Sequence, residues 1–136
     1  MFLLDTCVVS EGPKLKPNEG VARWMAAQDT PTLYISAVTA GELRYGVDRL
    51  PPGRESNRLH LWLEETLQKG FAGRILAFDH VIAALWGNLR AGYPNAEIAD
   101  SQIAATAMVR GLTLVTRNVK DFKFEGLVVV NPWERL

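Results

Sequence analysis

Five short apolar runs, separated for the most part by stretches with helical spacing, constrain the fold of this chain more than any other feature. They do not alternate apolar and polar residues, and they lie at residues 2–4, 33–35, 74–78, 112–116 and 127–130. Strands of this kind are typical of a parallel sheet that is covered on both faces, because alternation is expected where one face meets water. The pattern predicts an α/β domain with a mostly parallel five-stranded sheet between helices.

Helices are predicted between these runs from apolar residues at i, i+3 and i+4 spacing. They cover residues 21–29, 38–50, 54–70, 79–90 and a segment within 95–110. Residues 11–20 combine proline, glycine and charge, which predicts a loop. Ser36 and Asp79 are expected to cap helices, and Gly70 and Gly111 are expected to end them.

Composition narrows the classes of function. The chain has 136 residues, 48% of them hydrophobic, which predicts one globular domain over residues 1–136. Fifteen basic and fifteen acidic side chains balance, so a nucleic-acid site must be a local patch or must use metal ions. No apolar run approaches the roughly 18 residues that span a bilayer, and the start of the chain does not resemble a signal peptide. The lone Cys7 excludes an internal disulfide and fits a reducing cytoplasm.

Polar side chains gather where the predicted strands end, which is where parallel α/β sheets bind ligands. They are Asp5 and Thr6 after the first strand, Glu42 one turn into the helix after the second, Asp100 near the start of the helix before the fourth, and Thr116, Asn118 and Asp121 after the fourth. The four carboxylates are expected to share one acidic pocket. An alternative is a structural network in which Arg44, Arg117 and Lys120 offset the acids.

Taken singly, the acids have more than one interpretation. Asp100 continues an apolar helix face formed by Ile103, Ala104 and Ala107, which favours a metal or a partner because an isolated buried carboxylate is costly. A helix N-cap explains Asp100 equally well. A lone Glu42 is better explained as a solvated helix residue, Asp121 as a cap, and Asp5 as either a cap or an active-site acid.

As a set, the acids predict a site for a hard divalent cation. Magnesium prefers oxygen ligands and is usually held by one or two carboxylates together with waters and phosphate. Asp5 and Asp100 are the expected metal ligands, with Mg²⁺ as the ion and Mn²⁺ as its substitute. Hydroxyl or amide groups on Thr6, Thr116 and Asn118 are expected to position water or phosphate. His60 and His80 show no zinc-ligand spacing.

Five fragments in order resemble a known family. They read LLDTCVVSE, SAVTAGELRYGV, IADSQIAATA, LTLVTRNVKDF and VNPWE. Together they resemble PIN-domain proteins, and within these the VapC and FitB ribonuclease toxins. The resemblance implies a three-layer α/β/α sandwich and a cytoplasmic endoribonuclease toxin that uses Mg²⁺ or Mn²⁺. It places the catalytic acids at Asp5, Glu42, Asp100 and Asp121.

The resemblance also implies partners. Such toxins form homodimers and are neutralised by a small antitoxin that binds operator DNA. Tryptophan-bearing helices at residues 54–70 and 79–90 are expected among the dimer contacts. Trp24, Trp62, Trp86 and Trp133 are otherwise expected to pack in the core.

Two positions depart from the family pattern. Cys7 stands where the family commonly has asparagine, which replaces an amide beside the first acid by a weak donor. Glu97 is a spare acid three residues before Asp100. The change at Cys7 supports a second interpretation, a PIN-fold partner that serves mainly in DNA-bound regulation with its antitoxin. A phosphate-accepting receiver domain fits less well, because only Asp5 follows the first strand and Asn131-Pro132 follows the last.

Overall fold

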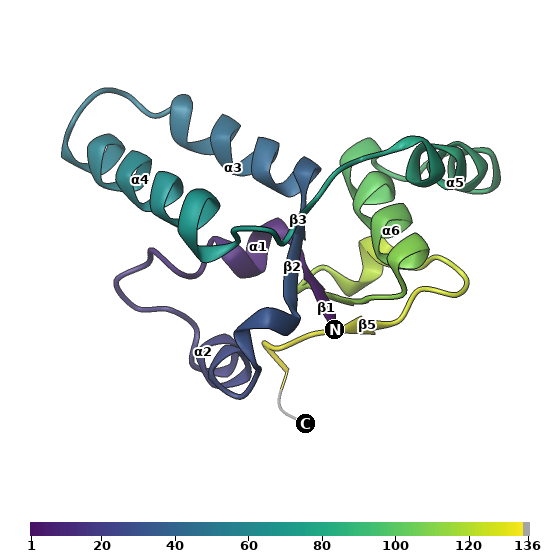
Figure 1. Ribbon diagram of the computed structural model, residues 1–136, viewed down its shortest axis with the longest axis horizontal. Helices are drawn as coiled ribbons and strands as arrows, with labels where there is room; N and C mark the ends of the chain where they lie inside the picture. The colour runs from purple at the N-terminus through teal and green to yellow at the C-terminus, as the bar shows by residue number, and fades with distance from the viewer. Residues whose placement is uncertain (135–136) are drawn as a thin grey trace.

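The computed structural model describes residues 1–134 and folds them around a five-stranded sheet (Figure 1). The strands are β1 (Phe2–Leu4), β2 (Leu33–Ser36), β3 (Ile75–Leu76), β4 (Thr113–Val115) and β5 (Val129–Val130). Their order is β3-β2-β1-β4-β5, and every neighbouring pair is parallel. The predicted α/β fold is thereby confirmed; the last two residues of the domain expected over 1–136 lie outside the described range.

Helices cover both faces of this sheet. They are α1 (Thr6–Val9), α2 (Glu19–Ala26), α3 (Ala37–Asp48), α4 (Arg54–Glu65), α5 (His80–Gly92) and α6 (Ile98–Arg110), with short helical turns η1 (Thr30–Thr32), η2 (Thr66–Gly70) and η3 (Val119–Phe122). The predicted caps form: Ser36 accepts from the Thr39 amide and Asp79 from the Ile82 amide. Gly111 ends α6 with φ 67°, in the left-handed region that favours glycine.

Several predicted boundaries differ from those in the structure. Helix α2 begins inside the predicted loop, because the Asn18 side chain accepts from the Val21 amide and caps it. The helix expected over 54–70 does end at Gly70, although its last turn takes the wider π form from Thr66 on. The strand expected over 74–78 keeps only two residues, because β3 pairs with β2 alone and β2 gives way to α3 after Ser36.

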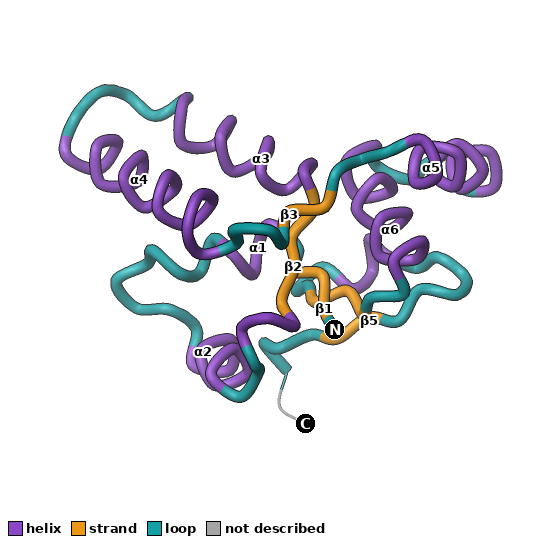
Figure 2. The backbone as a smooth tube through the Cα atoms, viewed as in Figure 1, coloured by secondary structure: helices purple, strands orange, loops and turns teal. Residues whose placement is uncertain are grey.

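Helices α5 and α6 lie on one side of the sheet and α1 to α4 on the other (Figure 2), and each group covers an apolar core. Leu3 and Leu114 pack with α5 and α6 on one face. Their neighbours Leu4 and Val115 pack with α1, α2, α3 and α4 on the other. Successive residues of a strand point to opposite faces, so the unbroken apolar runs serve both cores. Within residues 1–134, no helix is long and apolar enough to cross a membrane.

The tryptophans take part in this packing, as expected. Trp24 and Trp62 pack against the core under α1–α4, and Trp24 meets the Phe2 ring edge-on. Trp86 packs on the other face and donates to Ser101 Oγ at 3.0 Å. Trp133 lies against the core beside α2, where the chain comes down after β5.

The centre of the sheet is the point where the chain reverses its direction of travel. From β1 the chain moves outward through β2 to β3, and it returns through α5 and α6 to β4 on the other side of β1. The carboxyl ends of β1 and β4 therefore flank a topological switch point. In open parallel sheets this is where ligands bind.

Candidate functional site

Asp5 and Thr116 form the centre of the candidate site. The register that pairs Leu4 with Val115 continues one residue further, where the Asp5 amide donates to the Val115 carbonyl at 2.9 Å. One Asp5 oxygen accepts from Thr116 Oγ1 at 2.7 Å and the other from the Thr6 amide at 2.8 Å. Asp5 is only 5% exposed, so these bonds fix its carboxylate between two strand ends.

Glu42 is joined to this centre through Thr6. Thr6 Oγ1 donates to Glu42 Oε1 at 2.7 Å and lies 3.3 Å from Thr39 Oγ1. Glu42 is half-buried, and burial together with the charges of Asp5 and Glu97 raises its pKa, although the Thr6 bond opposes this. The interpretation of Glu42 as a solvated helix residue is therefore wrong.

Asp100 lies in the first turn of α6 but does not cap it. Glu97 is the N-cap, and its carboxylate accepts from the Ala99 amide at 3.1 Å and the Asp100 amide at 2.7 Å. Within residues 1–134 the Asp100 carboxylate has no hydrogen-bond donor. The capping interpretation of Asp100 is wrong, and its side chain is left free for another role.

The pKa of Asp100 reflects this environment. Burial, and then the charges of Glu97, Asp5, Asp121 and Glu42, raise it from 3.8 to about 7. The other three predicted acids, Asp5, Glu42 and Asp121, therefore all raise the pKa of Asp100 through their charges. Glu97, which the sequence left as a spare acid, acts on it more strongly than any other charge.

Asp121 and Asn118 complete the predicted set from η3. The Asp121 amide donates to the Asn118 carbonyl at 2.9 Å, and the exposed Asp121 side chain caps no helix. The Asn118 amide donates to Thr116 Oγ1 at 3.1 Å. Thr116 therefore connects η3 to Asp5, while the Asn118 side chain has no hydrogen bond within the described residues.

The four acids do not share a single pocket as predicted. Asp100 and Asp121 line a pocket of about 620 Å³, and Glu42 lines another of about 390 Å³ with Thr6. Asp5 is buried and lines neither, yet its charge acts on both Glu42 and Asp100. In the described chain, no three His, Cys, Asp or Glu side chains are grouped closely enough to hold a metal ion. The site is one electrostatic unit divided between two pockets.

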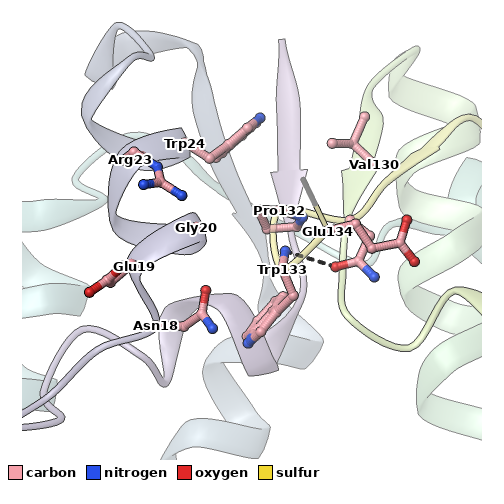
Figure 3. Close-up of a pocket in the computed structure, with 10 residues that line it drawn as sticks. Asn18, Glu19, Gly20, Arg23, Trp24, Val130, Pro132, Trp133 and Glu134 are labelled. Carbon is pink, nitrogen blue, oxygen red and sulfur yellow. Dashed lines mark hydrogen bonds between the residues drawn. The ribbon is translucent and has the colours of Figure 1, made fainter. Parts of the chain in front are cut away.

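A larger cavity of about 760 Å³ lies away from the acids, between α2 and the residues after β5 (Figure 3). One side of the cavity is closed because the segment after β5 lies directly against α2. The contact is so close that a Cβ added to Gly20 would lie 2.5 Å from the Pro132 carbonyl oxygen. The Trp133 amide donates to Asn131 Oδ1 at 2.9 Å and shapes the turn. Residue chemistry rather than cavity size therefore identifies the candidate site.

The proposed network of cations and acids does not form. Arg44 pairs with Glu64 and Asp48 between α3 and α4. Arg117 lies over the Trp133 ring, 5.6 Å from its centroid. In the part of the chain that the structure describes, none of the four acids has an ion pair. The sequence could not show this, because Arg44 and Glu42 are close in sequence but point to different neighbours.

Cys7 contacts the centre of the site. Its Sγ donates to Asp5 Oδ2 at 3.6 Å and lies 3.6 Å from Thr116 Oγ1. Burial raises the pKa of the Cys7 thiol, so it is neutral near pH 7 and serves as a weak donor. His60 by contrast pairs with Asp48, away from the acids, and His80 is exposed at the start of α5.

The raised pKa of Asp100 predicts a pH-dependent difference between the parent protein and Asp100→Asn. A raised carboxyl pKa stabilises the folded state fully below the unfolded pKa near 3.8, and this contribution is lost as pH rises through about 7. Without metal, we expect the variant and the parent to be similar in stability close to pH 3.8, and the variant to gain on the parent as the pH rises from there to about 7. At pH 8 the variant should be more stable by roughly 1 to 2 kcal/mol, after allowing for solvent screening. Urea unfolding in EDTA across this range measures the difference, and a constant difference would contradict it.

The chain resembles known proteins along nearly its whole length. The family model described as the PIN domain matches residues 2–124. Toxin FitB of Neisseria gonorrhoeae is 43% identical over 98% of this chain and 99% of its own length. VapC ribonuclease Y4jK of Sinorhizobium fredii is 38% identical over the same shares of both chains, 98% and 99%. A solved structure of FitAB bound to the IR36 DNA fragment matches with a TM-score of 0.91 at 38% identity, over 100% of this chain and 98% of that one.

Proposed function

Because this chain belongs to the PIN-domain family, we propose that it is a metal-dependent endoribonuclease and the toxin of a toxin–antitoxin pair. The main support is the acidic set at this edge of the sheet, because the charges of Asp5, Glu42 and Asp121 all act on Asp100. A relative named as a ribonuclease and another named as a toxin support the activity and its context.

The donor set fits a hard divalent cation. All of the side chains at this edge except Cys7 offer oxygen, and the unpaired carboxylates concentrate negative charge that a cation would offset. Asp5 and Asp100 are the proposed ligands, with Mg²⁺ as the ion and Mn²⁺ as its substitute. Because two carboxylates do not supply all the ligands that Mg²⁺ needs, waters and a phosphate oxygen would supply the rest. The bound ion would supply Lewis-acid polarisation of the phosphate and a water of lowered pKa.

The reaction is hydrolysis of an RNA phosphodiester. Water adds to phosphorus, the bond from phosphorus to the 3′ oxygen breaks, and the products carry a 5′ phosphate and a 3′ hydroxyl. Thr116 and the Thr6 amide hold the Asp5 carboxylate in one orientation. Glu42, with its raised pKa, is placed to accept a proton from water. Asp121 and Asn118 would position water or phosphate.

We further propose the molecular context. The chain is a single nuclease domain in the cytoplasm, held inactive by a small DNA-binding antitoxin that carries the complex to operator DNA. A homodimer is proposed through α4 or α5, on which Leu61 is 66% exposed and Val81 is 61% exposed. The similar structure of FitAB on DNA supports an assembly of this type.

One observation favours a second function. Cys7 gives Asp5 a weak sulfur donor at 3.6 Å, whereas the family commonly has an amide there. If this substitution removes activity, the protein serves mainly in DNA-bound regulation with its antitoxin.

RNA cleavage by the purified chain separates these functions. We expect a labelled single-stranded RNA or a tRNA pool to be cut with Mg²⁺ or Mn²⁺ and to stay intact in EDTA, because the acids alone cannot polarise the phosphate. The matching DNA strand should not be cut. The melting temperature of the protein should also rise when Mg²⁺ is added, since a ligand of the folded state stabilises it. Absence of cleavage with either ion, alongside a DNA-bound complex with the antitoxin, would support regulation instead.

A further inference from the structure

The pocket that contains Asp100 and Asp121 has a second wall that the proposed chemistry does not use. This wall carries two lysines, Lys120 and Lys123, and two aromatic rings, Tyr93 and Phe124. It comes from the end of α5, from η3 and from the segment after η3. The pocket volume of about 620 Å³ is within the range of roughly 300 to 1,000 Å³ that holds small ligands.

The two lysines are exposed and have no ion pair in the described chain, although Glu97, Asp100 and Asp121 line the same pocket. Lys14 and Lys69, by contrast, are engaged with Glu11 and Glu65. An ammonium group without a carboxylate partner is available to a phosphate.

The aromatic part of this wall is fixed in place. The rings of Tyr93 and Phe124 meet edge-on, with centroids 5.0 Å apart. The Tyr93 hydroxyl accepts from the Glu125 amide at 3.1 Å. Tyr93 is half-buried and lines the pocket. A held ring of this kind suits the face of a nucleobase.

The other pocket beside the acids is also lined by an aromatic ring, that of Trp62, but its lysine is not free of an ion pair. It is lined mainly by apolar side chains from α3 and α4, and its cations are already engaged: Lys14 pairs with Glu11 and Arg58 with Glu55. The two pockets on either side of Asp5 therefore differ in chemistry. Free positive charge beside an aromatic ring occurs on the α6 side.

We propose that the pocket between α6 and η3 binds the nucleotide adjoining the scissile phosphodiester. Lys120 and Lys123 bind its phosphate, and the Tyr93 ring packs against its base. The inference rests on the proposed ribonuclease function, and it explains how a chain of zero net charge presents local positive charge to RNA.

The test compares Lys120→Ala, Lys123→Ala and the double variant with Lys16→Ala, an exposed lysine outside this pocket. With Mg²⁺ and a short single-stranded RNA, we expect the double variant to raise KM about tenfold and to change kcat little. The slope of log(kcat/KM) against log[salt] should become less negative by about 0.7 for each lysine. Lys16→Ala should match the parent. Tyr93→Leu should raise KM, whereas Tyr93→Phe should not.

A binding assay makes the inference independent of cleavage. Fluorescence anisotropy in EDTA with a 2′-O-methyl RNA of the same sequence should show weaker binding by the double variant. If the parent cuts RNA but the double variant keeps its KM and salt slope, the inference fails and the ribonuclease proposal stands. A fall in kcat at unchanged KM also overturns it, since the lysines would then act on the acids. If the parent does not cut RNA yet binding needs the lysines, only the ribonuclease proposal fails.

Discussion

Asp100→Asn is expected to reduce metal-dependent RNA cleavage by at least about a thousandfold while the protein remains folded. The carboxylate has no donor within residues 1–134 and its pKa is raised to about 7 by burial and by Glu97, Asp5, Asp121 and Glu42. A proposed metal ligand that makes no other interaction should matter for catalysis alone. An interaction made chiefly in the transition state is worth several kcal/mol, and every 1.36 kcal/mol is about tenfold in rate.

Melting curves with and without Mg²⁺ check the assignment of Asp100 as a ligand. Without metal the variant should melt at the same temperature as the parent or above it, because one of several repelling charges is gone. With saturating Mg²⁺ the difference in melting temperature between the variant and the parent should shrink or change sign, since the parent gains binding energy that the variant has lost. Asp29→Asn, at an exposed aspartate with no capping bond, is the matched control. Full cleavage by Asp100→Asn would falsify the ligand assignment.

Asp5→Asn should also abolish cleavage, but with the opposite effect on stability. Asp5 is buried and its carboxylate accepts from Thr6, Thr116 and Cys7. An amide can keep the Thr6 bond, but it turns an NH₂ group toward the Thr116 hydroxyl. Hydrogen bonds to a charged group contribute roughly 1.5 to 3 kcal/mol each, whereas relief of repulsion from partly solvated acids contributes about 1 kcal/mol. The effect of the lost hydrogen bonds is the larger of the two, and we expect the free energy of unfolding to fall by about 1 to 2 kcal/mol.

Urea unfolding of the two variants in EDTA tests this contrast directly. The same change of aspartate to asparagine should stabilise the protein at one position and destabilise it at the other. Thr116→Val on the parent background should reproduce part of the Asp5 loss, because it removes the shared hydroxyl bond. Equal shifts for Asp5→Asn and Asp100→Asn would show that the hydrogen bonds to Asp5 are not the source of its stability.

The sequence predicted the sheet and the edge that carries the acids, for identifiable reasons. The apolar runs at residues 2–4 and 112–116 predict strands of a parallel sheet, and in the structure the parallel pairing of these two strands brings Asp5 and Thr116 together. The predicted strand at 74–78 was too long because the run cannot reveal that β2 ends at Ser36 and leaves the last residues without a partner.

Contacts between side chains that are far apart in the chain could not be predicted from the sequence. The N-cap interpretation of Asp100 was open from the sequence, and in the structure Glu97 caps α6 instead. The hydrogen bond from Thr6 to Glu42 joins residues 36 positions apart, and no local pattern indicates it. The division of the acids between two pockets depends in the same way on how α3 and α6 meet at the sheet.

The position of β1 has a consequence for the order of events during synthesis. The first strand made is the central one, and it pairs with β4 through Phe2 and Thr113. Contacts between such distant segments form late in folding, because a long loop must close before they stabilise anything. A ribosome-bound chain without β4 has Asp5 but no Thr116 to orient it, so the nascent protein should be catalytically silent. Activity should begin only once the segment that forms β4 has left the ribosome and paired with β1.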